Sequence, residues 1–214
     1  MYKKKPFFIV FEGVEGCGKS YQSKKLFNKL KQKKIDTILT REPGGTKSSE
    51  LIRNLILKDY FKKKKLEKFD KYTDTLLYLA ARNEHVKNKI KPALIRKKVV
   101  ICDRFVDSTL AYQVYGKKVD IKFINNIHKK ILRGIKPNIV FILKVSTKSS
   151  KNRLKKRRTK NRYDNFAQSF YTKAQKSFIK LAKRKKNYFI LDSSENDNTV
   201  EEKILNIVNK QLNI

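Results

Sequence analysis

The chain has 214 residues, and its 54 Lys and Arg against 19 Asp and Glu give a formal net charge of +35. This length suits one hydrophobic core, and no Pro/Gly/Ser-rich linker divides it, so we expect a single domain over residues 1–214. The two cysteines, Cys17 and Cys102, are too few for a disulfide framework and favour a reducing compartment. No apolar run approaches the roughly 20 residues of a membrane span, and the opening stretch lacks a signal-peptide cleavage pattern. We therefore expect a cytoplasmic protein without a membrane partner.

The strong positive charge raises the question of a nucleic-acid partner, because such a surface attracts any polyanion. The lysines are spread over every segment instead of gathering in one tail or stripe, and the chain has only 7 Gly and no Trp. This distribution indicates a bias in the overall composition of the chain, with lysines on all solvent-exposed surfaces. Because charge alone defines no site, we expect no specific nucleic acid.

Short apolar runs alternate with segments of helical periodicity along the chain. The runs, rich in β-branched and aromatic residues, predict five strands, at 7–11, 37–40, 98–102, 138–145 and 187–191. Apolar residues at helical spacing predict helices at 19–33, 47–58, 70–96, 105–115, 120–133, 147–157, 165–185 and 199–212. Strands that alternate with helices predict an α/β fold in three layers, with a five-stranded parallel sheet flanked by helices. Ligands of such sheets bind beyond the carboxyl ends of the strands.

The stretch FEGVEGCGKS follows the first predicted strand and opens the first predicted helix. It matches the P-loop pattern G-x-x-x-x-G-K-[ST], in which backbone N–H groups and a helix N-terminus surround a phosphate chain. Lys19 is expected to reach the β- and γ-phosphates, and the Ser20 hydroxyl to bind Mg²⁺. The pattern therefore predicts a nucleoside triphosphate site at Gly13, Val14, Glu15, Gly16, Cys17, Gly18, Lys19 and Ser20.

Candidate site residues also follow the second and third predicted strands. TREPGGT places Glu42 and Pro43 at the expected ligand crevice, and CDRFVDSTLAYQ begins with Asp103 and Arg104. Asp103 is suited to orient Mg²⁺, directly or through water, and Arg104 to clamp a phosphate. We expect Glu42 as a further metal ligand. No N-K-x-D motif for reading guanine is present, which argues against a GTPase.

The stretches FEGVEGCGKS, TREPGGT, LLYLAARNEHV, CDRFVDSTLAYQ and NRYD have the order and spacing found in thymidylate kinases, which phosphorylate dTMP with ATP. The resemblance covers nearly the whole chain, and REPGG combined with DR and AYQ is far more specific than the P-loop alone. It implies a P-loop kinase fold, direct in-line transfer of the γ-phosphoryl group from Mg·ATP to dTMP, and a homodimer.

The resemblance also implies an acceptor site for dTMP. Glu15 matches an acidic position near the 3′-hydroxyl of the sugar, and Tyr78 matches an aromatic residue that stacks on thymine, which is commonly Phe in the family. Glu42 and Pro43 lie in the matching crevice. The remaining matches are Arg53, Arg82 and Arg104 around the acceptor phosphate, and Ser108, Tyr112 and Gln113 at the sugar and base.

The segment KKRRTKNRYD resembles the mobile helical lid that closes over ATP, at about residues 153–165. In one subclass of the family a catalytic arginine lies in the P-loop, at the position that is Gly16 here. The resemblance therefore implies that a lid arginine stabilises the transferring phosphoryl group. Arg162 is the main candidate, with Arg157 and Arg158 beside it.

The sequence as a whole predicts an ATP-dependent dTMP kinase. Two alternatives remain open at this point. The chain could be a related nucleoside monophosphate kinase that acts on UMP, CMP or dUMP, or a P-loop protein that binds nucleic acid through its positive surface.

Overall fold

The computed structural model describes residues 4–57, 68–156, 168–183, 185–195 and 197–214. Its centre is a sheet of five parallel strands, β1 (Phe7–Glu12), β2 (Thr37–Arg41), β3 (Val99–Asp103), β4 (Ile139–Lys144) and β5 (Tyr188–Asp192). The strand order is β2-β3-β1-β4-β5. The predicted parallel sheet is confirmed, and each predicted strand agrees with the observed one to within one residue at either end.

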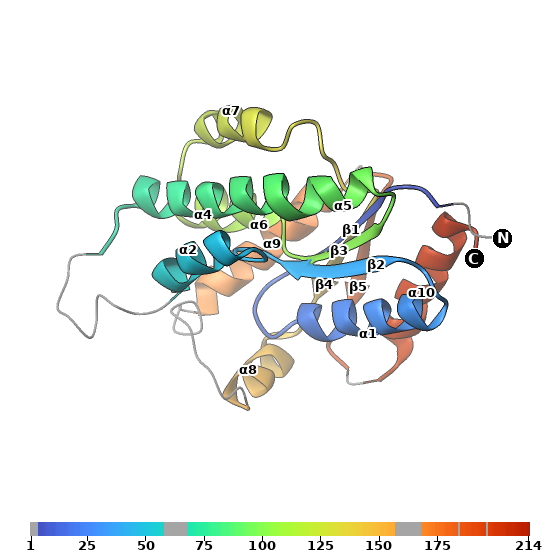
Figure 1. The fold of residues 1–214 in the computed structure, drawn as a ribbon. Coiled ribbons are helices and arrows are strands. Elements are labelled where there is room, and N and C mark those ends of the chain that lie inside the picture. The colour runs from blue at the N-terminus through green and yellow to red at the C-terminus, as the bar shows by residue number, and fades with distance from the viewer. Residues whose placement is uncertain (1–3, 58–67, 157–167, 184, 196) are drawn as a thin grey trace.

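Helices cover both faces of this sheet (Figure 1). On one face lie α1 (Lys19–Gln32) and α10 (Thr199–Leu212), which pack against each other. On the other lie α5 (Lys91–Ile95) and α9 (Gln168–Ala182), which contact β3 and β4. The three central strands β1, β3 and β4 are buried on both sides almost along their whole length, and this explains their continuous apolar sequences.

The remaining helices surround the carboxyl end of the sheet or lie outside it. They are α2 (Lys47–Leu57), α4 (Lys71–His85), α6 (Val106–Thr109), α7 (Ile121–Ile131) and α8 (Thr147–Lys155). α2 packs against α4, and α7 covers the outer side of α4 (Figure 1). No helix in the described part of the chain is long and apolar enough to cross a bilayer.

The two longer helical segments around the site contain wide π-helical turns, η1 (Val86–Ile90) and η2 (Leu110–Gly116). The first joins α4 to α5 directly before Pro92, which has no N–H for the regular helical hydrogen bond. The second continues α6 and carries Tyr112 and Gln113, both buried. The helices predicted at 70–96 and 105–115 therefore exist as continuous segments, but their winding is not uniform.

Candidate active site

The P-loop connects β1 to α1 and folds tightly around the side chain of Lys19. Gly13 has a φ of 140°, and a Cβ atom there would lie 2.5 Å from the carbonyl oxygen of Leu143 in β4. Only glycine therefore fits this close approach between the loop and the sheet. The Nζ of Lys19 donates to the carbonyl of Val14 at 2.8 Å, so the buried lysine lies inside the loop.

Ser20 and Asp103 form the part of the site suited to a metal ion. The hydroxyl of Ser20 donates a short hydrogen bond to Oδ2 of Asp103. The pairing of β1 with β3 produces this contact, because it aligns Phe11 with Asp103 at the strand ends. A hydroxyl beside a carboxylate fits Mg²⁺, which usually takes one or two protein oxygens and completes its shell with phosphates and water. Among the described residues no cluster of three or more His, Cys, Asp or Glu side chains offers a metal site.

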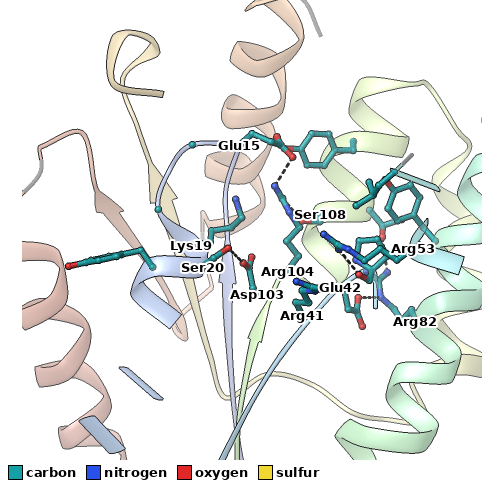
Figure 2. Close-up of a pocket in the computed structure, with 18 of the residues that line it drawn as sticks. Glu15, Lys19, Ser20, Arg41, Glu42, Arg53, Arg82, Asp103, Arg104 and Ser108 are labelled. Carbon is teal, nitrogen blue, oxygen red and sulfur yellow. Dashed lines mark hydrogen bonds and ion pairs between the residues drawn. The ribbon is translucent and has the colours of Figure 1, made fainter. Parts of the chain in front are cut away.

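One cavity of about 580 Å³ joins the P-loop to the acceptor residues expected from the sequence. Figure 2 shows Lys19 and Ser20 on one side, Arg53 and Arg82 on the other, and Asp103 and Arg104 between them. The predicted residues that line the cavity are Glu15, Gly16, Gly18, Lys19, Ser20, Glu42, Pro43, Arg53, Tyr78, Arg82, Asp103, Arg104, Ser108, Tyr112 and Gln113. Gly13, Val14 and Cys17 do not line it. Arg157, Arg158 and Arg162 lie outside the described residues.

Glu15 and Arg104 form an ion pair at the top of this cavity in Figure 2. Nη2 of Arg104 donates to Glu15 at 2.8 Å, and the hydroxyl of Tyr112 donates to the other carboxylate oxygen at 2.5 Å. Burial opposes ionisation of Glu15, but the charges of Arg104 and Lys19 outweigh it and hold the pKa of this carboxyl below its usual range. Glu15 is therefore an ionised hydrogen-bond acceptor that faces the cavity.

Arg104 holds its guanidinium against the P-loop through an unusual backbone conformation. Its φ is 73°, a left-handed value that costs free energy for a residue with a side chain. The N–H of Arg104 donates to the carbonyl of Phe11, and Nη1 donates to the carbonyl of Gly13 at 2.9 Å. These contacts fix the distance between the P-loop and the segment after β3.

The metal-ligand role expected for Glu42 does not fit the structure. Its carboxylate is buried, with Oε2 accepting from Nε of Arg82 at 2.7 Å and Oε1 lying 3.1 Å from Nδ1 of His85. The charge of Arg82 and the contact with His85 overcome the effect of burial and lower the pKa of Glu42. The positive charge of the Arg82 guanidinium beside this carboxylate disfavours a metal cation, so Glu42 orients Arg82 instead.

His85 extends the same buried network to the turn after β2. Its Nε2 lies 2.6 Å from the hydroxyl of Thr40. A Cβ atom on Gly45, which has a φ of 93°, would lie 2.5 Å from both His85 Nε2 and the Thr40 hydroxyl. The second glycine of REPGG is therefore required so that the turn can pack directly on this histidine.

The comparisons with known proteins agree with the geometry. The sequence model of the family described as thymidylate kinase matches residues 11–204. This chain belongs to the thymidylate kinase family. It is 41% identical over 209 residues to the thymidylate kinase of Aster yellows witches'-broom phytoplasma, covering 96% of each chain. It is 43% identical over 178 residues to that of Wolbachia pipientis wMel, covering 82% of this chain and 84% of the other.

A solved structure of the family has the same fold. The crystal structure of thymidylate kinase from Ehrlichia chaffeensis superposes with a TM-score of 0.75 at 31% identity. The match covers 95% of this chain and 99% of that one. The likeness confirms the predicted P-loop kinase fold.

Two of the side chains that line the cavity of this family member are suited to a nucleobase. Tyr78 is half-buried and offers a ring face. Gln113 is buried, and its Nε2 has no hydrogen-bond partner among the described residues. A buried amide donor without a partner is costly, so a polar group of a ligand would satisfy it.

Sequence reasoning missed several residues that line the same cavity, namely Tyr21, Arg41, Leu57, Thr109, Arg153 and Leu154. Arg153, at the start of the expected lid segment, donates to the carbonyls of Gly16 at 3.2 Å and Ser193 at 2.7 Å. It thereby links the P-loop to the loop after β5. Thr109 lies within the stretch CDRFVDSTLAYQ, but only its contact with Arg82 distinguishes it from its neighbours.

Proposed function

We propose that this chain transfers the γ-phosphoryl group of ATP to dTMP, giving ADP and dTDP. The observation that carries the proposal is the single cavity that joins Lys19 and Ser20 of the P-loop to Arg53 and Arg104. Both nucleotides are anionic, and cationic groups on each side of one cavity allow two phosphate chains to approach each other. The family of the chain supports the choice of dTMP as acceptor.

The donor side of the reaction is assigned to the P-loop. The N–H groups of the loop and the N-terminus of α1 would bind the phosphates of ATP. Lys19 would leave the carbonyl of Val14 and contact the β- and γ-phosphates. Ser20 and Asp103 would hold Mg²⁺, which neutralises charge on the phosphate oxygens when it is bound.

The acceptor side is assigned to the arginines and the residues at the base. Arg53 and Arg104 would hold the phosphate of dTMP, and Arg82 would add one further N–H donor. The ionised carboxylate of Glu15 would accept a hydrogen bond from the 3′-hydroxyl, since each of its oxygens has a second lone pair. Tyr78 would stack on thymine, and Gln113 would donate its unpartnered N–H to the base edge.

No general base is needed, because the acceptor phosphate is already ionised at neutral pH. The protein therefore has to position the two phosphates and stabilise the charge that develops between them. Gly16 carries no charge, so we assign that stabilisation to Lys19 and to a lid arginine, with Arg162 as the first candidate.

The test is a coupled assay for ADP release with ATP, Mg²⁺ and a panel of monophosphates: dTMP, dUMP, UMP and CMP. We expect dTMP to have the highest kcat/KM, with dTDP identified as the product by mass spectrometry. Preference for another monophosphate would replace dTMP as the substrate, and ATP hydrolysis without phosphorylation of any acceptor would refute the proposal.

We further propose a cytoplasmic homodimer. The two cysteines are free and buried, in keeping with a reducing compartment. Leu51 and Leu55 of α2 and Leu76 of α4 are exposed, on two helices that pack against each other, and a second copy could cover them. Light scattering coupled to gel filtration gives the mass, and a concentration-independent monomer would refute the dimer.

A further inference from the structure

His128 connects an outer helix to the acceptor part of the cavity. It lies on α7, whose buried residues are Ile124 and His128, and α7 contacts α4, the helix that carries Arg82. The Nε2 of His128 is 2.7 Å from Nη1 of Arg82. Neither the spacing of the motifs nor the family resemblance assigns a role to this histidine.

The contact with Arg82 determines the protonation state of the His128 ring. A guanidinium has only N–H donors, so Nε2 must be the acceptor and the ring proton must lie on Nδ1. Burial, together with the charge of Arg82, lowers the pKa of His128 to about 3, which keeps the ring neutral. Nδ1 is buried without a hydrogen-bond partner among the described residues. The ring therefore supplies an acceptor to Arg82 while its own donor remains unsatisfied.

Four buried hydrogen-bond acceptors, His128 among them, surround the guanidinium of Arg82. Nε donates to Glu42 at 2.7 Å, Nη1 to the Thr109 hydroxyl at 2.7 Å and to His128, and Nη2 to the carbonyl of Phe105 at 2.8 Å. A guanidinium has five N–H donors, so these four contacts leave one, on Nη2. Arg82 is only 3% exposed but still lines the cavity.

We propose that His128 is a positioning residue for the acceptor nucleotide, because it fixes the guanidinium of Arg82 so that the remaining N–H on Nη2 faces the cavity. Without an acceptor at Nε2, one N–H of Nη1 would be buried and unpaired. If the guanidinium rotated to find a partner for this N–H, its other hydrogen bonds would be disturbed, and the free N–H of Nη2 would no longer point toward the ligand. The inference rests on the proposed function in treating this part of the cavity as the dTMP site.

The test compares two substitutions of His128 in steady-state kinetics. His128→Gln keeps an oxygen acceptor near the position of Nε2, whereas His128→Leu fills similar volume without one. We expect His128→Leu to raise the KM for dTMP about tenfold, the effect of an unsatisfied buried donor, and to leave the KM for ATP within about twofold. His128→Gln should remain close to the wild type. If the leucine variant does not fold, His128→Asn, which is too short to reach Arg82, replaces it.

A matched control separates positioning from a loss of stability. Ile124→Val alters the other buried side chain of α7 and should lower the melting temperature without changing the KM for dTMP. If folded His128→Leu also leaves this KM unchanged, the histidine is only structural and the inference is wrong.

A double-mutant cycle tests whether the effect passes through Arg82. In an Arg82→Lys background, His128→Leu should change the KM for dTMP by less than about twofold, because the interaction is already lost. An equal effect in both backgrounds would overturn the inference. If the wild type does not use dTMP, the proposed function fails on its own, and the same variants are compared with the monophosphate that the wild type does phosphorylate.

Discussion

Replacing Glu12 with glutamine should change how the stability of this fold depends on pH. Glu12 ends β1 and is completely buried. Its carboxyl group accepts hydrogen bonds from the N–H groups of Phe105 and Ser108, at 2.7 and 3.1 Å, and from the Ser108 hydroxyl at 2.6 Å. Burial, followed by the nearby charge of Asp107, raises the pKa of Glu12 to about 8, although Ser108 and Arg104 act in the opposite direction.

The sign of the effect follows from proton binding. The pKa of Glu12 in the folded chain lies above the value of 4.5 for an ordinary glutamate, so between these values the folded chain holds a proton that the unfolded chain has released. The stability that this proton provides is complete below about pH 4.5 and is lost as the pH rises through 8. Within this window each pH unit changes the free energy of unfolding by about 1.4 kcal/mol. From pH 5 to pH 8 the free energy of unfolding of the wild type should therefore fall by up to about 4 kcal/mol relative to that of Glu12→Gln.

The measurement is urea unfolding followed by circular dichroism at pH 5, 6, 7 and 8. Glu195→Gln, which removes the same formal charge from an exposed loop, serves as the control. The free energy of unfolding of the wild type should fall relative to that of Glu12→Gln as the pH rises, and should stay parallel to that of Glu195→Gln. Parallel curves for the wild type and Glu12→Gln would show that Glu12 is ionised in the folded chain across this range, and the reasoning would be wrong.

Three further predictions concern the proposed reaction. Lys19→Ala should fold normally but lower kcat by about 100- to 1000-fold, and near-normal turnover of ATP and dTMP would contradict the role of the P-loop lysine. Gln113→Ala should raise the KM for dTMP without affecting ATP, whereas a change confined to the KM for ATP would mean that the two sites are wrongly assigned. Arg162→Ala should lower kcat about 1000-fold with little change in either KM, and more than the double variant Arg157→Ala, Arg158→Ala. Preserved turnover after removal of all three arginines would exclude the lid as the source of the catalytic charge.

The sequence by itself determined the elements of the fold and the P-loop motif, from which the donor half of the site is predicted. The five strands and most helix ends follow from local periodicity, since a buried parallel strand is a short apolar run and a helix repeats its apolar face. The P-loop is equally local. Gly13, Lys19 and Ser20 lie within eight consecutive residues, and their spacing alone predicts that they surround one phosphate chain.

The tertiary structure alone decided which polar side chains meet beneath the acceptor site. The position of Glu42 after β2 predicts a metal ligand, but Arg82 and His85, 40 and 43 residues away in sequence, contact its two oxygens. Thr109 and His128 are likewise identified only by the structure, which shows that both accept hydrogen bonds from Arg82. A hydrogen bond requires its two atoms to lie about 3 Å apart. When the two residues are on separate helices, their separation in the sequence does not predict whether they come that close. Their roles therefore depend on how α4 packs against α7 and the segment after β3.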